Sequence, residues 1–444
     1  MEEKTKQIVE NALQLALDAG AEHARITYNQ NRQSCVSVLG KEIDKINQSC
    51  GSSMYIQIFT DGRYGAFSTN QLEGREVENL IRKGIQITKL VAEDPDRCLP
   101  DPELYFKKTE NTPDLCLEDK TYNEIPTELK KELALNTSAE IYGTDSRLVF
   151  NASEYNDSYD YNYMIDSNGF RGEDIQTRFS LSCECGVKGR SDSRPEAWFY
   201  ESALFLKDMQ RSDVGRKALQ RALDRLNPKK IRSGKYNTVI EYRVASKLLN
   251  PILNSLNGAA VHNKQSFLIG REGKKVFGDN LTLIDRPHLV GAGGARYFDG
   301  EGIATHDMDI IRDGAIMSYY ILPYYSKKLG MPVTIESPSV LSFEASGEYI
   351  SEDAASMIRS LEKGIYITGF NGGNCNQTTG DFSFGVEGFY FEQGQIRFPI
   401  KEMNITGNMI TLWNQLLLVG KDFNPSTNWR VPSLAFGNAD FNGI

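Results

Sequence analysis

The sequence predicts an α+β protein with two domains: an N-terminal domain of helices packed on an antiparallel sheet, and a C-terminal domain that is mostly β. Three observations predict this class. The 444 residues exceed what one hydrophobic core usually organises. Helical and strand periodicities alternate in the first half. Residues 227–234, with their Pro, Gly and Lys, then precede a stretch rich in Gly, Asn and β-forming residues. We therefore assign residues 1–227 to the first domain and 228–444 to the second.

Helices of the first domain are predicted from the spacing of apolar residues. Between residues 4 and 19, apolar side chains recur at helical intervals, and Gly20 supplies a C-terminal stop. Later helices are expected over about residues 75–92, where Pro95 follows, and over 128–139 and 212–226.

Strands of the first domain are predicted from alternation. Met54, Ile56 and Ile58 alternate with Tyr55 and Gln57, and a hairpin turn at residues 60–63 follows them. Together these segments predict an antiparallel meander. The expected strands are residues 24–28, 34–38, 43–47, 52–59, 64–68, 147–151, 159–165 and 174–186.

The second domain is expected to open with a strand at residues 236–242 and a helix at 244–256. Short β-forming segments dominate the remainder, with a hairpin turn at residues 392–394. The domain is therefore predicted to be mostly β. The expected strands lie near residues 281–284, 309–312, 340–345, 365–370, 388–392 and 395–398.

Charge and composition exclude several classes of partner. The formal net charge is -9, with 59 acidic against 50 basic residues, which argues against a nucleic-acid-binding surface. Residues 1–6 are charged, unlike a secretory signal, and the longest strongly apolar run, residues 416–419, is far below the roughly 20 residues of a membrane span. Seven sparse cysteines fit a reducing compartment. We expect a cytoplasmic protein without nucleic-acid or membrane partners.

A local metal site is not expected. The histidines are His23, His262, His288 and His306, and no two lie within a helical turn or two of each other. A His-Glu-…-His zinc site on one helix is therefore excluded, whereas a site assembled from distant His and Cys stays open as the less favoured alternative.

Cys375 is a candidate nucleophile. It lies in the polar loop at residues 371–380, where a neighbouring base could activate its thiol. An ordinary loop cysteine is the favoured interpretation, because thiolate formation requires a specific electropositive setting.

Asp299 and Glu301 are candidate binding carboxylates. They stand two residues apart between glycines, so they could orient the amine of a peptide or brace a turn through side-chain hydrogen bonds to the backbone. The turn is the favoured interpretation, because Asp and Glu beside Gly are common turn residues.

Several motifs, in this order and spacing, resemble the TldD/PmbA family over nearly the whole chain. They include Phe-Asp-Gly-Glu-Gly-Ile-Ala-Thr at residues 298–305, Ile-Arg-Asp-Gly at 311–314 and Thr-Gly-Asp-Phe-Ser-Phe-Gly at 379–385. Residues 322–330 and 388–394 add to the resemblance.

The resemblance implies a particular branch of that family. A TldD-type subunit carries a His-Glu-x-x-x-His helix directly after the first strand of the second domain, with a further Cys near the C-terminus, and its zinc would activate water. Here the matching helix has no His and no acid in any register, and residues 428–434 contain no Cys. The positions where ligands would be expected hold Leu249, Asn250, Asn254 and Ser255.

The sequence is thus identified as a member of the TldE (PmbA) branch, with no catalytic residue and no cofactor of its own. The resemblance implies a TldD-like partner that carries zinc, unfolded peptides as substrates, and a homodimer when the chain is alone. The family name "modulator of DNA gyrase" would then be indirect.

Two other functions stay open from the residues alone. The chain could be an autonomous hydrolase that uses Cys375, or Asp299 and Glu301, with a distant histidine. It could also be a homo-oligomeric peptide-binding protein without chemistry.

Overall fold

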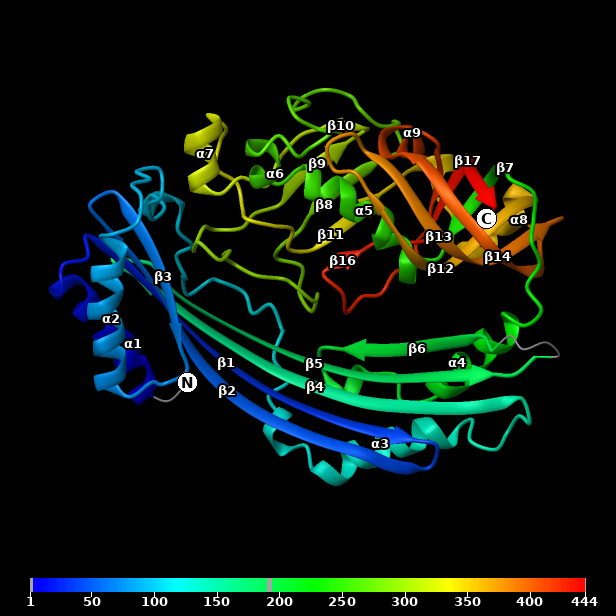
Figure 1. Cartoon of the computed structure of the whole chain (residues 1–444), viewed down its shortest axis with the longest axis horizontal. Coiled ribbons are helices and arrows are strands. Elements are labelled where there is room, and N and C mark those ends of the chain that lie inside the picture. Colours follow the sequence, from blue (N-terminus) through cyan, green and yellow to red (C-terminus); the bar gives the residue numbers. More distant parts are fainter. Residues whose placement is uncertain (1–2, 190–193, 444) are drawn as a thin grey trace.

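A long antiparallel sheet carries the first domain. The computed structural model describes residues 3–189 and 194–443, and the sheet has the strand order β3-β2-β1-β4-β5-β6 (Figure 1). Each strand runs antiparallel to its neighbours, as the predicted meander requires. The strands are β1 (His23–Leu39), β2 (Glu42–Thr60), β3 (Arg63–Thr69), β4 (Leu148–Asp166), β5 (Arg171–Val187) and β6 (Glu196–Ala203).

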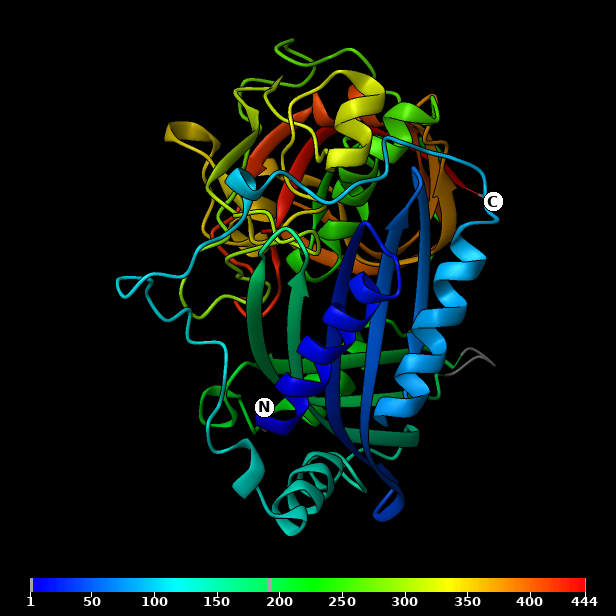
Figure 2. The same cartoon turned by 90° about the vertical axis from the view of Figure 1, so that its left-hand side faces the viewer.

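Helices cover the convex face of this curved sheet (Figures 1 and 2). Two apolar cores lie between them and the strands: one contains Val9 and Ile56, the other Leu181 and Ala218. The N-terminal domain is therefore helices packed on one antiparallel sheet, as predicted. The helices are α1 (Glu3–Asp18), α2 (Gly74–Thr88), α3 (Thr127–Ala139) and α4 (Val214–Asp224).

The concave face of the same sheet is turned toward the second domain (Figure 1), and the side chains that β1 contributes to it are mostly polar. Side chains alternate along a strand, so β1 directs Ile26, Tyr28 and Val36 to the helices and its intervening residues to the concave side. Those intervening residues include Asn31 and Gln33. Strand β1 is thus apolar on its convex side and mostly polar on its concave side.

Several predicted strands were too short. Residues 24–28 and 34–38 belong to the single strand β1, and 43–47 and 52–59 belong to β2. The intervening polar residues interrupt the apolar pattern, but the pairing of β1 with β2 and β4 continues through them. Strand β6 was not predicted, and α2 ends at Thr88, before the expected residue 92.

The second domain is mostly β, as predicted, and is built on a barrel. Strand β7 pairs with β12 on one side and β17 on the other, and β14 pairs with β17, so the sheet closes on itself. Strand β15 pairs with β17 outside the closure. The strands are β7 (Gly234–Ile240), β12 (Lys363–Cys375), β13 (Asp381–Glu392), β14 (Gln395–Asn408), β15 (Leu416–Val419) and β17 (Leu434–Gly443).

A second sheet of the order β10-β9-β8-β11-β16 packs beside the barrel. Its strands are β8 (Thr282–Asp285), β9 (Met308–Arg312), β10 (Ala315–Ile316), β11 (Leu341–Glu344) and β16 (Trp429–Arg430). The helices of this domain are α5 (Tyr242–Ser255), α6 (Gly258–His262), α7 (Pro323–Leu329), α8 (Ala354–Leu361) and α9 (Met409–Trp413).

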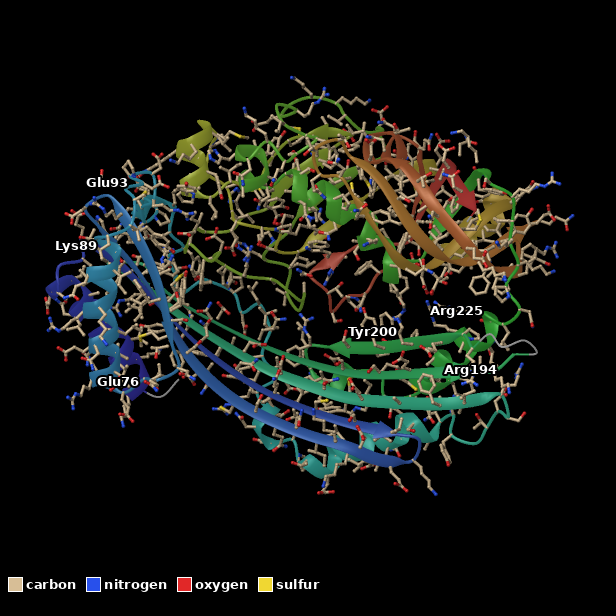
Figure 3. The ribbon with its side chains drawn as sticks, viewed as in Figure 1. Glu76, Lys89, Glu93, Arg194, Tyr200 and Arg225 are labelled. Atoms are coloured by element: carbon tan, nitrogen blue, oxygen red, sulfur yellow. The ribbon has the colours of Figure 1, made fainter. Side chains whose placement is uncertain are left out.

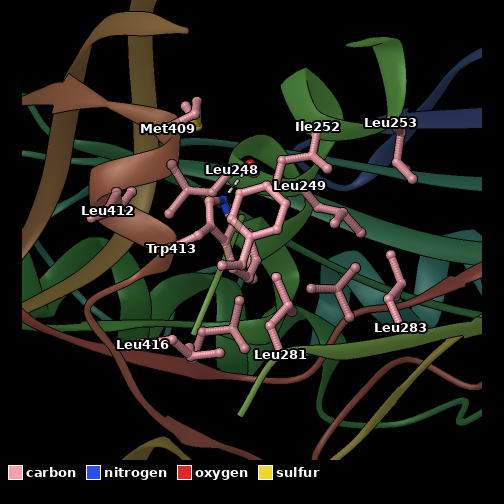
Figure 4. Packing of buried hydrophobic residues seen from close by; sticks show 14 of the residues in the cluster. Leu248, Leu249, Ile252, Leu253, Leu281, Leu283, Met409, Leu412, Trp413 and Leu416 are labelled. Carbon is pink, nitrogen blue, oxygen red and sulfur yellow. Dashed lines mark hydrogen bonds between the residues drawn. The ribbon is translucent and has the colours of Figure 1, made fainter. Parts of the chain in front are cut away.

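Trp413 occupies the middle of the large core between these elements (Figure 4). Its indole is fully buried and donates from Nε1 to the carbonyl oxygen of Leu248 on α5, at 3.3 Å. The ring of Phe436 meets it edge-on, with centroids 5.3 Å apart. Helix α5 is therefore fixed by its apolar face, which includes Leu249.

An irregular segment between α2 and α3, residues 89–126 and here called the strap, joins the two domains. The carbonyl of Leu117 accepts from the amide of Thr177 on β5, and that of Leu115 accepts from Gly291 in the second domain. The amide of Phe106 donates to the carbonyl of Gly302. The strap thus hydrogen-bonds to both domains.

The chain passes between the domains once more after α4, through residues 225–233.

Among residues 3–189 and 194–443, no helix is long and apolar enough to cross a bilayer.

Candidate functional site

Helix α5 follows β7 and holds the positions where the family resemblance places metal ligands. Leu249 has no exposed surface and packs with Ile252 and Trp413 in the core (Figure 4). Asn250 and Asn254 are exposed on the opposite side of the helix. Ser255 is buried, and its hydroxyl donates to Oε1 of Gln377 at 2.9 Å.

These side chains do not fit a zinc site. Zinc in proteins is held by thiolate, imidazole and carboxylate groups, whereas this helix offers an aliphatic side chain, two amides and a hydroxyl that is already bonded. In the described ranges, no three His, Cys, Asp or Glu side chains are grouped so that they could hold a metal ion.

His23 and His262 have separate surroundings, whereas the charge of His306 acts on His288. Nε2 of His288 lies 3.0 Å from the hydroxyl of Thr305, and Nδ1 of His23 lies 3.4 Å from that of Ser167. Burial lowers the pKa of His288. The ring of His262 packs against Tyr325.

Cys375 ends strand β12 and is half-buried. Burial, followed by the nearby carboxylate of Asp381, raises the pKa of its thiol to about 11. A nucleophilic cysteine needs the opposite shift, because the thiolate is the reactive form. This environment therefore favours the neutral thiol at physiological pH.

Asp299 braces the turn that begins at its own position. The side chain is 2% exposed, and Oδ1 accepts from the amides of Glu301 and Ile303, at 2.9 and 3.0 Å. Oδ2 accepts from the amide of Glu336 at 3.1 Å. Burial and the charge of Glu336 raise the pKa of Asp299 to about 7.

Glu301 joins the two domains through Arg25 on β1. Oε2 of Glu301 lies 2.6 Å from Nη1 of Arg25, whose Nη2 donates to Oδ2 of Asp166 at 3.1 Å and to the carbonyl of Glu301 at 2.8 Å. The hydroxyl of Tyr105, in the strap, also donates to Asp166. Burial alone would lower the pKa of Arg25, but Glu301 and Asp166 raise it.

The predicted carboxylates and the predicted thiol therefore have different partners. Asp299 and Glu301 share one turn at the domain junction, and Cys375 ends a barrel strand. This geometry does not assemble them into one set of reacting groups.

Sequence reasoning missed the concave face. A hollow of about 510 Å³ lies on it, lined largely by amide and hydroxyl side chains. The alternation of Asn29, Asn31 and Gln33 along β1 was the available signal. The lining residues are Gln33, Ser34, Cys35, Asn47, Gln48, Ser49, Asn156, Asp157, Ser158, Arg178 and Ser180.

A second hollow, of about 320 Å³, lies where β6 meets the barrel. Trp198 is 55% exposed there and stacks on Tyr200, with ring centroids 5.3 Å apart. The outer edge of β6 is closed by arginines: Arg243 donates to the carbonyl of Tyr200 at 3.0 Å, and Arg225 to that of Glu196 at 2.8 Å. Figure 3 shows Tyr200 and Arg225 on this side of the sheet.

Comparison with known proteins identifies the family of this chain. Residues 120–226 match the PmbA/TldA metallopeptidase central domain, and residues 233–443 match the PmbA/TldA metallopeptidase C-terminal domain. A crystal structure of a suggested modulator of DNA gyrase from Bacteroides thetaiotaomicron is 40% identical, covers 100% of this chain and 99% of its own, and superposes with a TM-score of 0.96. The chain belongs to the PmbA/TldD family.

Other members of the PmbA/TldD family match over the full length. Metalloprotease PmbA of Escherichia coli O157:H7 is 26% identical, over 97% of this chain and 95% of its own. TldE from Thermococcus kodakarensis shares the fold, with a TM-score of 0.84, 18% identity and coverage of 98% and 100%. The PmbA/TldD motif at residues 298–305 is the turn that Asp299 braces and Glu301 ties to Arg25.

Proposed function

We propose that this PmbA/TldD-family chain is the non-catalytic, TldE-type subunit of a cytoplasmic metallopeptidase complex that degrades or processes unfolded peptides. Its partner is a TldD-like subunit, which supplies the zinc. The observation that carries the proposal is α5: the family fold is present in both domains, yet the helix after β7 presents Leu249, Asn250, Asn254 and Ser255 where ligands would be needed. No reaction step is assigned to this chain.

The concave face supports unfolded peptide as the substrate class. Side-chain amides and hydroxyls can donate to and accept from the backbone of any extended peptide, because each residue of that peptide presents the same N–H and C=O groups. Asn156, Ser158 and Ser180, on β4 and β5, line such a hollow. Recognition of this kind does not depend on peptide sequence.

The deciding experiment measures zinc content and hydrolysis of unfolded peptides for three samples: this chain, a TldD-type chain, and their mixture, each with and without chelator. We expect zinc in the TldD-type chain and full turnover only in the mixture. Stoichiometric zinc or chelator-sensitive turnover in this chain alone would overturn the proposal. Chelator-insensitive turnover that Cys375→Ser abolishes would point to an autonomous hydrolase instead.

A variant of the concave face tests the peptide surface. Asn156→Trp fills part of the hollow and should reduce turnover of the mixture severalfold, while the zinc content stays the same. Asn11→Trp replaces an exposed asparagine on α1, on the convex side, and serves as the matched control. Equal turnover for the two variants would remove the concave face from the proposal. Saturable peptide binding by the chain alone, with no association to a TldD-type chain, would favour a homo-oligomeric peptide-binding protein.

A further inference from the structure

An aromatic platform lies in the hollow between β6 and the barrel, here called the β6 hollow. Trp198 and Tyr200 stand two residues apart on β6, and their rings are nearly parallel, at 18°. Ala197 and Phe199 are buried in the core on the convex side, so Trp198 and Tyr200 point to the concave side of the sheet. Trp198, which is 55% exposed, therefore offers a large apolar surface to solvent.

The backbone of β6 presents hydrogen-bonding groups at the same place. Arg225 donates to the carbonyl of Glu196 and Arg243 to that of Tyr200, so these two carbonyls point away from β5 (Figure 3). Alternate residues of a strand direct their backbone groups to the same side, and the amide and carbonyl of Trp198 therefore point outward between the two arginines. A peptide residue that pairs antiparallel with them places its own side chain beside the indole, because directly opposite residues share a face of the sheet.

The charges around the β6 hollow balance each other. Arg221 donates to both carboxylate oxygens of Glu241, at 2.6 and 2.7 Å, and Arg225 lies 2.9 Å from Glu387. An anionic group would have to compete with these carboxylates, whereas an uncharged ring gains free energy by leaving water and can also lie against a guanidinium plane. The hollow therefore suits an aromatic side chain better than an acidic one. Its lining contains as many arginines as glutamates: Arg221, Arg225 and Arg243 against Glu184, Glu196 and Glu387.

The opposite wall of the β6 hollow comes from β12 in the second domain. Thr368, Gly369 and Phe370 lie there, where the pairing of β12 with β13 is irregular. The volume of about 320 Å³ is at the small end of ligand pockets, which measure roughly 300–1,000 Å³. The hollow thus has room for one large side chain, held between the two domains.

The β6 hollow is close to the hollow on the concave face. Ser202 on β6 pairs with Ser180, which pairs with Asn156, and the last two residues line the concave hollow. Trp198 precedes Ser202 by four residues on β6, which is about 13 Å along a strand. An extended peptide covers that distance in about four residues. One unfolded peptide can therefore occupy both hollows.

We propose that the β6 hollow is a subsite for one aromatic side chain of an extended peptide. The ring of that side chain stacks against the indole of Trp198, and the peptide residue that carries it bonds to the outward amide and carbonyl of Trp198. Folded proteins bury most of their large apolar side chains, so the subsite favours unfolded chains. This inference rests on the proposed function, because it adds a side-chain preference to the sequence-independent recognition by the concave face.

Binding of labelled peptides tests the subsite. Each peptide is a short chain of Gly, Ser and Asn with Phe, Ala or Glu at its centre. Fluorescence anisotropy measures its affinity for the mixture of this chain with a TldD-type chain, and a chelator is present to prevent zinc-dependent cleavage. We expect the Phe peptide to bind about tenfold more tightly than the Ala peptide. Trp198→Ala should reduce this difference to less than about twofold, and Trp198→Phe should retain most of it.

Tyr142→Ala is the matched control, because it removes another exposed aromatic ring of the first domain. This variant should keep the full preference for the Phe peptide. A peptide with benzoylphenylalanine at its centre gives a second measurement that needs no substitution in the protein. After irradiation, it should be attached to β6 or to residues 368–370 of β12, as peptide mapping by mass spectrometry would show.

Several results would overturn the proposal: no saturable binding of the Phe peptide, equal affinity for the Phe and Ala peptides, tighter binding of the Glu peptide, a preference that survives in Trp198→Ala, or cross-links only at other places. None of these measurements needs turnover. A Phe preference that depends on Trp198, without zinc-dependent turnover in the mixture, would keep the subsite and remove the proposed function. Turnover in the mixture without that preference would do the reverse.

Discussion

Arg25 has no exposed side-chain surface, and a carboxylate from each domain balances its charge. We expect Arg25→Ala to lower the free energy of unfolding by about 3–5 kcal/mol, because the buried carboxylate of Asp166 is left without its charged partner and Glu301 loses its link to the first domain. Urea unfolding followed by circular dichroism measures the loss.

The control for Arg25 is Arg171, whose side chain is 59% exposed and pairs with Glu10. Arg171→Ala should cost about 0–1 kcal/mol, because exposed ion pairs contribute little. If the two substitutions had equal effects, the buried network would not hold the domains together.

Asp299 makes the free energy of unfolding depend on pH. Its pKa is raised from 3.8 to about 7 in the folded chain, so the folded state keeps a proton that the unfolded state releases. The contribution of this group is therefore fully present below about pH 4 and is lost as the pH rises toward about 7.

Unfolding at several pH values, compared between the native chain and Asp299→Asn, measures this contribution. The variant is less stable throughout, since the amide cannot accept from Glu336 as the carboxyl does, but it should lack the decline of the native chain between pH 4 and 7. Parallel pH profiles would contradict the assignment.

The residues also show how far the candidate site could be predicted. The lack of ligands on α5 followed from the residue types alone, because no arrangement turns Leu249 or Asn250 into a zinc ligand. The bond from Arg25 to Glu301 spans 276 positions. Glu301 stands in a local turn motif, but nothing in that motif points to Arg25. Pairing of that kind depends on how the domains meet, which periodicity does not encode.

At the scale of elements, the turn at residues 298–303 combines a left-handed backbone with close packing. Gly302 has φ +80°, and a Cβ there would lie 2.8 Å from the ring of Phe170. Gly302→Ala should therefore cost more than backbone strain alone, about 2–4 kcal/mol in the free energy of unfolding.

Gly62 provides the matched comparison. It has φ +66° in the turn between β2 and β3, and a Cβ there would meet nothing within 4 Å. Gly62→Ala should thus cost about 1–2 kcal/mol, from the backbone alone. Thermal unfolding of both variants separates the two contributions, and equal losses would show that Phe170 moves aside freely.

Element types were predictable where apolar residues recur at one period. Helices α2 and α4 follow such patterns, as does the alternating second half of β2. The concave residues of β1 and β4 are polar, so the pattern broke each long strand into fragments. Barrel closure was not predictable, because it depends on pairing between β7 and β17, which lie at opposite ends of the domain.

At the scale of the whole molecule, the strap and the Arg25 network connect two domains that each have their own core. We expect one calorimetric unfolding transition for the native chain. Unfolding of either domain would break the Arg25 network and expose its buried charges to water. Arg25→Ala should broaden or divide that transition. Two well-separated transitions in the native chain would contradict this coupling.

The closure of the barrel has a consequence for how the protein is made. Lys235 on β7 and Asp440 on β17 are ion-paired although they are 205 positions apart, and β17 fills the place between β7 and β14. During translation, β7 therefore leaves the ribosome with both sides open, and the side that β17 covers stays open until residues 434–443 have followed. The first domain can begin folding while the second is still being synthesised, so we expect the nascent chain to be most prone to aggregate at the stage of the unfinished barrel, whose strand edge is unpaired.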